Sequence, residues 1–332
     1  MSNRIELPNI TPECLREIEE KQKQGTQFVQ KFDAKNYLNT RPDPGKTEKK
    51  VTIRLLPMDL KTGNPFQRVH FHNVQVPPEV AGEGRKPFKS YICLDERKNP
   101  DIDHEKYGSK CPFCEINYKA YKKSTETTDP VEKKAWQDIS VHNLSNEAYI
   151  VRVIERGKED EGVKFWKFNT RNDKKDPFHV LMDLFHQRED EGKAAGEKVN
   201  IFDIYEGYDL TVTFTAGTPV PPPTIMDAKK PSPLSEDEEQ MRAWIFDEKK
   251  WQDVFTPKDY NYLSIISEMR VPWFDKTKGI WVDKEEYMKE HKDEFSKKPS
   301  TNEPSYTEPV EKSGLANAVV VDDNEGEEDL PF

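Results

Sequence analysis

The sequence predicts a mainly β chain with α-helical insertions, an α+β fold built on a small antiparallel barrel. Five or six short strand-like runs lie between residues 51 and 217, and a cysteine-bearing insertion interrupts them. Only 34% of the residues are hydrophobic, another 34% are charged, and 25 are prolines. This composition indicates a moderate core surrounded by long irregular segments.

The N-terminal segment, residues 1–45, is expected to contain one helix and a linker. Thr11 suits the N-cap of a helix over residues 10–25, Pro12 suits its first turn, and Gly25 suits its end. The proline- and glycine-containing stretch that follows reads as a connection to the first strand.

The core is expected to span residues 46–220. Its strands are predicted from β-branched and aromatic runs bounded by turn residues, at 51–57, 68–76, 89–93, 147–155, 163–169 and 209–217. The last run alternates apolar residues with threonines, as in a half-buried antiparallel strand. Among small barrels with such strands, the oligonucleotide-binding (OB) fold is the commonest with a nucleic-acid role.

Helical patterns occupy the insertion and the C-terminal third. They are predicted over 114–123, over 129–139, and over Phe178–Phe185, where apolar residues recur at helical spacing. The region 221–296 is expected to be a helical extension packed on the core. Its two short helices follow Ser235 and Asp283, each with a glutamate three residues on, as in a capping box.

Three cysteines predict a metal site in a subdomain of about residues 70–125. Cys111 and Cys114 in "CPFC" have the spacing with which two thiolates grip one tetrahedral zinc, and Cys93 lies upstream. Candidates for the fourth ligand are His70, His72 and His104, and spacing alone does not choose among them. A redox pair is the alternative, but no thioredoxin-like context surrounds the motif. Three thiolates and one imidazole would form one closed, structural zinc site.

Compartment and charge follow from the same composition. The N-terminus has no apolar signal core and no run is long enough to span a bilayer, so a soluble cytoplasmic protein without membrane contact is expected. Cys14, the fourth cysteine, is not assigned to the predicted metal site. The net charge is −11, but six of the carboxylates lie in the last eleven residues, which leaves −5 for the remainder. The stretch 163–175 has five bases and one acid, so a locally basic surface is compatible with this charge.

Cations and aromatic residues are interleaved in a way that suits single-stranded nucleic acid. Non-specific binding needs cations for phosphates and rings on which bases stack. In "VKFWKF" one strand face is predicted to be core and the other groove, with Lys164 and Trp166 favoured toward DNA; the sequence does not decide between the faces. The tyrosines after the cysteine pair suit stacking, or a solvated helix face. The candidates are Arg54, Lys89, Tyr91, Tyr107, Tyr118, Lys119, Tyr121, Lys122, Lys123, Arg152, Lys164, Trp166, Arg171, Lys174 and Lys175.

The order of these segments resembles one known family. "IRLLP", "FQRVHFH", "YIC", "KYGSKCPFC", "AYIVRVI" and "GVKFWKF" follow one another as in the single-stranded DNA-binding, helix-destabilising proteins of T-even-type tailed phages. The resemblance covers about residues 50 to 190. It implies an OB-fold with a zinc site of His72, Cys93, Cys111 and Cys114, a role in phage DNA replication, recombination and repair, no enzymatic activity, and the host cytoplasm as location.

The last residues are similar to a different group. "DDNEGEEDLPF" (322–332), at the end of a polar segment from 297 that is expected to be disordered, resembles the acidic C-terminus of bacterial single-stranded DNA-binding proteins. Such a tail can occupy the protein's own basic groove and offer its tip to partners. The expected partner-binding residues are Asp329, Leu330, Pro331 and Phe332. The expected partners are a polymerase, a helicase loader or primase, and a recombinase.

Two other classes remain as alternatives. A zinc hydrolase would use the histidines beside the cysteine motif, but the chain has no HExxH, no His-x-Glu deaminase pairing and no phosphate-binding glycine loop. A zinc-ribbon transcription or assembly factor would share the metal site but would not need the interleaved aromatic and basic residues. Preference for duplex DNA would favour this second alternative.

Overall fold

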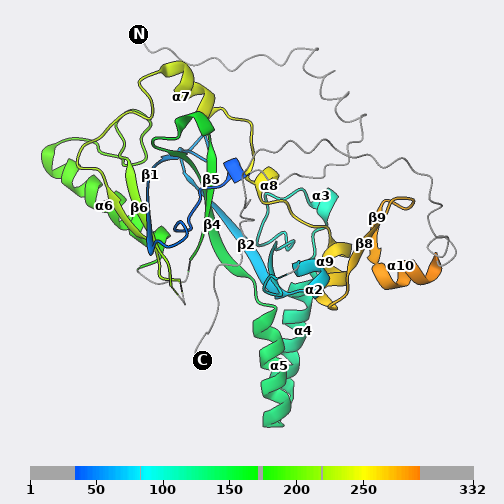
Figure 1. The fold of residues 1–332 in the computed structure, drawn as a ribbon. Coiled ribbons are helices and arrows are strands. Elements are labelled where there is room, and N and C mark those ends of the chain that lie inside the picture. Colours follow the sequence, from blue (N-terminus) through cyan, green and yellow to red (C-terminus); the bar gives the residue numbers. More distant parts are fainter. Residues whose placement is uncertain (1–33, 83, 171–174, 218–219, 292–332) are drawn as a thin grey trace, which may run out of the picture. The chain divides into compact units, whose positions relative to one another are not determined.

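A computed structural model describes residues 34–82, 84–170, 175–217 and 220–291 of the chain. The expected N-terminal helix over 10–25 and the tail from 297 lie outside these residues. Within them the fold is mixed α+β and is dominated by one antiparallel sheet (Figure 1). The predicted fold class is confirmed at this level.

The main sheet contains all six predicted strands and one that the sequence did not reveal. In chain order they are β1 (Glu48–Leu56), β2 (Phe66–Gln75), β3 (Phe88–Ile92), β4 (Asn146–Glu155), β5 (Lys164–Asn169), β6 (Leu210–Thr215) and the additional β7 (Thr224–Asp227). Every pairing between them is antiparallel.

The long strand β4 is the spine of this sheet. Along one edge it pairs with β5 over residues 148–153, and along the other with β2 over 146–151 and then with β1 over 152–155. The sheet therefore forks into a β2–β3 wing and a β1–β6–β7 wing. Among the described strands no pairing joins the two wings, so the sheet is not closed into a barrel.

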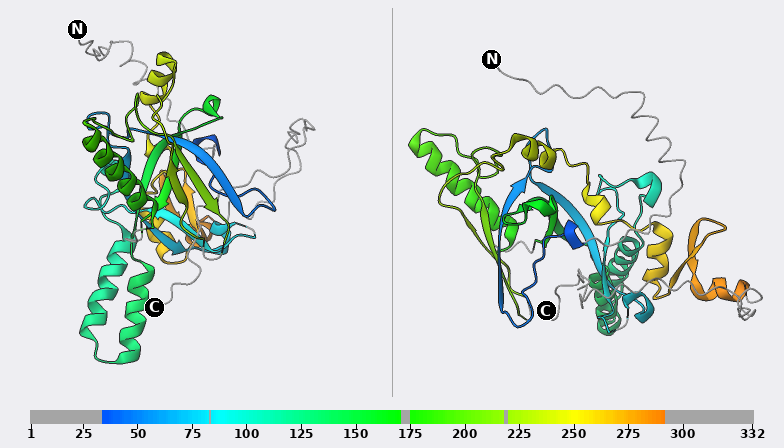
Figure 2. Two further views of the ribbon diagram at one scale, coloured as in Figure 1. Left: turned by 90° about the vertical axis from the view of Figure 1, so that its left-hand side faces the viewer. Right: turned by 45° about the horizontal axis from the view of Figure 1, so that its top comes forward.

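Both faces of the sheet are covered. Helix α6 (Pro177–Ala195) lies on one face, where its Leu181 packs in a cluster with Trp166 and Phe168. Asp176 caps its first turn by accepting a hydrogen bond from the His179 amide, and Gly196 ends it at φ 78°. On the other face lies the chain that carries α7 (Glu238–Ile245) and α8 (Trp251–Val254) (Figure 2).

The insertion between β2 and β4 carries β3 and four helices. They are α2 (Pro78–Ala81), α3 (His104–Tyr107), α4 (Pro112–Glu126) and α5 (Pro130–His142). α4 and α5 form a helical hairpin that projects from the sheet (Figure 1). Its two helices are joined by the Asn117 side chain, which donates to the Ser140 carbonyl at 2.6 Å, and by Lys123, whose ammonium lies 4.1 Å from the Trp136 ring centre.

The C-terminal part of the described chain forms a small second sheet between helices. It consists of α9 (Tyr260–Ser267), β8 (Pro272–Asp275), β9 (Ile280–Asp283) and α10 (Lys284–Glu290). Two 3-10 turns complete the elements, η1 (Ala34–Asn36) and η2 (Glu159–Glu161). The predicted helices after Ser235 and Asp283 are present as α7 and α10; Asp237 caps the first and Asp283 the second. None of the described helices is long and apolar enough to cross a membrane.

Candidate functional site

Four side chains from β2 and from two parts of the insertion meet in one buried cluster. His72 lies on β2, Cys93 directly follows β3, Cys111 is the N-cap of α4, and Cys114 lies in its first turn. Their ligand atoms all lie within 4.8 Å of one another. Only Cys114 is partly exposed.

The distances in this cluster fit a tetrahedral metal site. The Cys93 and Cys114 sulfurs are 3.5 Å apart, and Nε2 of His72 lies 3.4 Å from the Cys111 sulfur and 3.6 Å from the Cys114 sulfur. Zinc bound at about 2.3 Å to sulfur and about 2.0 Å to nitrogen would separate its ligand atoms by roughly 3.5–3.8 Å. The four side chains could therefore hold one metal ion.

Hydrogen bonding around the sulfurs favours a thiolate in this cluster. Contacts from the Cys114 and Cys93 side chains lower the pKa of Cys111 to about 3, and backbone amides of Cys114 and Leu94 act in the same direction. The contact with Cys111 raises the pKa of the Cys93 thiol, as does its burial. The Lys98 ammonium lies 3.4 Å from the Cys114 sulfur. Negative charge is thus favoured on the Cys111 sulfur, and a bound cation would neutralise it.

The structure selects His72 among the three candidate histidines. His70 lies on the same strand, but its ring is directed at Glu147, with 3.8 Å between Nε2 and the carboxylate. Both ring nitrogens of His104 contact backbone carbonyls, of Gly108 at 3.0 Å and of Asn99 at 2.9 Å. His72 is fully buried against the Phe113 ring, and no described residue accepts a hydrogen bond from its Nδ1.

Asn99 fixes the loop that carries Cys93. Its side-chain nitrogen donates to the carbonyls of His70 and Cys93, both at 2.7 Å, and its oxygen accepts from the His70 amide at 2.7 Å. One buried amide thus ties the strand beside His72 to the segment that holds a cysteine ligand. No sequence motif indicates this role, because it depends on contacts between segments far apart in the chain.

Helix α4 extends from the cluster and presents rings and cations to solvent. Tyr118 is 68% exposed and Tyr121 is 60% exposed. With Cys114 they follow one another at helical spacing along one face, so a stripe of rings begins at the metal cluster. Three lysines flank this stripe and are also exposed: Lys119, Lys122 and Lys123. The predicted interleaving of aromatic and basic side chains on this helix is present on its surface.

The expectation that Lys164 and Trp166 face DNA is wrong, because both are buried. Trp166 is 3% exposed and packs edge-on against Phe214. Lys164 is 3% exposed, and its ammonium lies 2.5 Å from carboxylate oxygens of both Glu155 and Glu161. Both faces of β5 belong to the core, since α6 covers one and the chain of α7 and α8 covers the other.

Two predicted phosphate-binding arginines hold the C-terminal extension instead. Arg54 is 1% exposed; it donates to the carbonyls of Asp203 and Ser232 and lies 3.4 Å from the Asp209 carboxylate. Arg152 is 5% exposed and donates to the carbonyls of Trp244, Ile245 and Asp247. Neither guanidinium can reach a phosphate in this arrangement. Burial lowers the pKa of Arg54 to about 10 and shifts the pKa of Arg152 in the same direction.

The remaining predicted residues divide into three groups. Tyr91 is 7% exposed against the Tyr262 ring and is removed from the candidate surface. Lys89 and Tyr107 are partly exposed. Lys175 is exposed and lies two residues before α6, about 60 residues after Cys114 in the chain. Arg171, Lys174 and the tail residues Asp329 to Phe332 lie outside the described residues.

Three residues of a basic and aromatic stretch at the start of β3 were missed, beside the predicted Lys89. Phe88 is 42% exposed, and Arg85 and Lys86 beside it are exposed as well. The signal was present in the sequence as "RKPFK", the same alternation of cations and rings that drew attention to α4. Because it lies in a connection rich in glycine and proline, its sequence predicts a loop.

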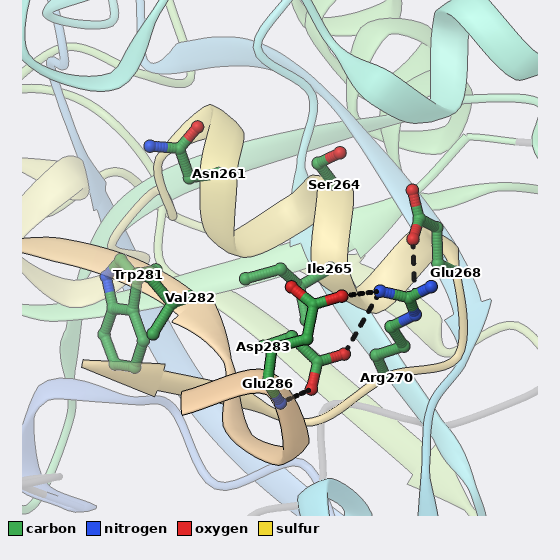
Figure 3. Close-up of a pocket in the computed structure, with 9 residues that line it drawn as sticks. All are labelled: Asn261, Ser264, Ile265, Glu268, Arg270, Trp281, Val282, Asp283 and Glu286. Carbon is green, nitrogen blue, oxygen red and sulfur yellow. Dashed lines mark hydrogen bonds and ion pairs between the residues drawn. The ribbon is translucent and has the colours of Figure 1, made fainter. Parts of the chain in front are cut away.

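A separate surface hollow lies between α9 and β9, away from the cysteine cluster (Figure 3). Arg270 projects into it and is paired with Glu268, Asp283 and Glu286 at 3.0–3.4 Å. Its charge is therefore already compensated. The preceding Met269 has φ 58°, a left-handed conformation that ends α9. Nothing in this hollow adds to the candidate site.

No protein-family model matches this chain, and no curated protein shows significant sequence similarity to it.

Proposed function

We propose that this chain binds single-stranded DNA without sequence preference and holds one structural zinc ion. The observation that carries the proposal is the exposed stripe of Tyr118 and Tyr121 with three flanking lysines, on a helix whose first turn is anchored in the metal cluster. Such a protein would protect single strands in phage DNA replication, recombination and repair, as the resemblance to the T-even-type family implies.

The donor set supports zinc as the metal and a structural role for it. Three sulfurs and one imidazole are typical ligands of structural zinc, and side chains fill all four positions. A hydrolytic metal would need an open position for water. When bound, zinc would supply a fixed cross-link between β2, the Cys93 loop and the start of α4, and this chain's residues would do the DNA binding.

The geometry of α4 supports base stacking. Tyr118 and Tyr121 are three residues apart, so their positions differ by about 4.5 Å along the helix axis. This is of the same order as the roughly 3.4 Å step of one nucleotide. The flanking lysines can contact the phosphates that run beside stacked bases. The aromatic stretch at Phe88 and the lysines beside it add a further candidate contact.

The OB-fold is part of this proposal. It is supported by β4, which takes β2 as partner over its first half and β1 over its second. A strand that changes partners in this way bends a sheet toward closure. The zinc-ribbon factor remains the rival, because it would share the metal cluster, but the exposed tyrosine stripe would have no role in it.

Titration of the full chain with poly(dT) tests the proposal. We expect saturable quenching of tyrosine and tryptophan emission, and an affinity that falls steeply with salt as counterions are released from the strand. Duplex DNA of equal length should compete poorly. Preference for the duplex, or an affinity that does not change with salt, would contradict the proposal and favour the zinc-ribbon alternative.

We propose two separate roles for the acidic tail, residues 322–332. Its carboxylates would compete with DNA for the protein's cationic surface, and its last residues, Asp329 to Phe332, would bind replication and recombination proteins. Deleting residues 322–332 should tighten poly(dT) binding and abolish partner binding, whereas Phe332→Ala should lose only the partners. Pull-down with a host or phage polymerase, helicase loader, primase or recombinase gives the second readout. If both variants behave as wild type, the tail has neither role.

A further inference from the structure

Lys98 carries a positive charge that no carboxylate contacts in the described part of the chain. Its side chain is partly buried, and its ammonium donates to the Cys114 sulfur at 3.4 Å and to the Ser145 hydroxyl at 2.6 Å. The neighbouring Arg97 differs, because it donates to the Asp95 carboxylate at 2.8 and 3.0 Å. Among the contacts of the Lys98 ammonium, only the Cys114 sulfur can carry the opposite charge.

The backbone around Lys98 is held in a fixed turn. The amides of Lys98 and Asn99 both donate to the Asp95 carbonyl, at 2.9 and 3.0 Å. The Asn99 side chain in turn donates to the carbonyls of His70 and Cys93. The residue next to Lys98 is thus anchored beside a candidate metal ligand, which limits the positions that the lysine can take.

Cys114 differs from the other three candidate ligands in its exposure. It alone is partly exposed, whereas the other three are buried. Backbone amides of Cys114 and Leu94 donate to the Cys111 sulfur. The Cys114 sulfur receives the Lys98 ammonium instead. The ligand that solvent can reach is therefore the one that a charged side chain contacts.

The charge of a filled site would require a nearby cation. A zinc ion with three thiolates and one neutral imidazole would carry about one negative charge. A net charge in a largely buried site is costly unless an opposite charge lies beside it. The Lys98 ammonium would supply that charge. A hydrogen bond between an ionised donor and an ionised acceptor is also about twice as strong as a neutral one.

We propose that Lys98 is the charge-compensating residue of the metal site. Its ammonium hydrogen-bonds the Cys114 thiolate of the filled site, balances the charge of the complex and keeps this exposed ligand on the metal. Lys98 does not bind the metal itself, so it is a positioning residue. This role rests on the metal binding of the proposed function and is independent of its DNA binding.

A purely structural role for Lys98 is the alternative. Ser145 directly precedes β4, so its contact with Lys98 also joins the loop after Cys93 to the end of the helical hairpin. That contact could order the insertion without any effect on the metal. The two roles can be separated, because only the charge-compensating role acts through the Cys114 sulfur.

Competition for zinc between the full chain and a chelating dye of known affinity, measured without DNA, tests the proposal. Lys98→Met should lower the affinity for zinc roughly ten- to hundredfold, as the loss of an outer contact to a metal ligand usually does. Lys98→Arg keeps the charge and should recover at least part of the affinity. Lys110→Met is the matched control, because Lys110 is an exposed lysine directly before Cys111. This control should bind zinc nearly as wild type.

Cobalt bound in place of zinc gives a readout that a structural role would not change. Without its hydrogen bond the Cys114 sulfur donates more electron density, so the sulfur-to-cobalt charge-transfer band should move to lower energy in Lys98→Met. Ser145→Ala should leave this band and the zinc affinity unchanged, because the lysine still contacts Cys114. Iodoacetamide should alkylate Cys114 of the zinc-loaded protein faster in Lys98→Met than in wild type, as measured by peptide mass.

Equal zinc affinities of Lys98→Met and Lys110→Met would overturn the role of Lys98. A loss of affinity in Ser145→Ala as large as that in Lys98→Met would overturn it as well, in favour of the structural role. If Lys98→Met does not fold, Lys98→Gln gives the same comparison with a polar, uncharged side chain. A wild-type chain that binds no metal would contradict the proposed metal site. Zinc binding that is equally tight in wild type and in the Lys98 variants would contradict only the role of Lys98.

Discussion

Replacing Cys111 with serine is expected to abolish metal binding and to unfold the insertion. Structural zinc sites contribute on the order of 10 kcal/mol of binding free energy, which is comparable with the whole stability of a typical domain. The four ligands join β2, the Cys93 loop and the first turn of α4, and α5 has no buried residue of its own. A bound metal would therefore fix the start of the helical hairpin, which also packs on α9 through Phe113. Elemental analysis of the purified protein and thermal unfolding with and without a chelator measure the two effects.

His70→Asn is the matched control for this substitution. It changes a histidine on the same strand, two residues from His72, whose ring faces Glu147 and lies outside the cluster. This variant should retain one metal per chain and unfold at nearly the wild-type temperature. Chelation of the wild-type protein should reproduce the Cys111→Ser behaviour. A Cys111→Ser protein that keeps its metal and its stability would show that the cluster is not the metal site.

The sequence was sufficient to place β1 to β6 and three of the four candidate metal ligands, but β7, β8 and β9 lie in a region that was expected to be helical. Strand alternation and turn residues are local properties, so β1 to β6 could be predicted from short windows. The spacing of Cys111 and Cys114 is also local, because both lie in one turn before and within α4. The choice of His72 over His70 required the family resemblance or the structure. It is decided by side-chain placement, because Nε2 of His72 lies 3.4 Å from the Cys111 sulfur whereas the His70 ring faces Glu147.

The errors concern residues whose environment is set by distant parts of the chain. Alternation in β5 correctly separates Trp166 from Phe165, but it cannot show that both sides are covered. The cover on one side comes from α6 and on the other from residues near Trp251 and Phe255. From its residue type alone, Lys164 is predicted to lie in solvent. In the structure it is buried between the carboxylates of Glu155 and Glu161.

The same limit applies to the buried arginines. Arg54 and Arg152 resemble phosphate ligands in composition, but backbone carbonyls of residues about 90 to 180 positions later accept their hydrogen bonds. A buried guanidinium satisfied in this way fixes the path of the extension, and removing it would leave several carbonyls without donors. Lys119, Lys122 and Lys123 of α4 are instead exposed, because they lie on the hairpin that projects from the sheet (Figure 1).

Replacing both Tyr118 and Tyr121 with alanine is expected to weaken single-strand binding strongly. Each stacked ring contributes about 1–3 kcal/mol, so the loss of two amounts to about 2–6 kcal/mol, or roughly thirty-fold to more than ten-thousand-fold in affinity. Both side chains are more than half exposed, so the folded protein and its metal content should be unchanged. Poly(dT) titration at several salt concentrations measures the affinity and its salt dependence together.

The salt dependence of the affinity distinguishes base stacking on the tyrosines of α4 from phosphate binding by its lysines. The tyrosine variant should keep the wild-type slope of affinity against salt, because no phosphate contact is lost. Changing Lys119, Lys122 and Lys123 to glutamine should instead reduce that slope by about 2, since each phosphate contact on a single strand contributes about 0.7. Tyr205→Ala is the matched control, because Tyr205 is 58% exposed but lies in the connection between α6 and β6. If Tyr205→Ala weakens binding as much as the α4 variant, or if the α4 variant binds as wild type, the strand does not stack on this helix and the DNA-binding surface lies elsewhere on the chain.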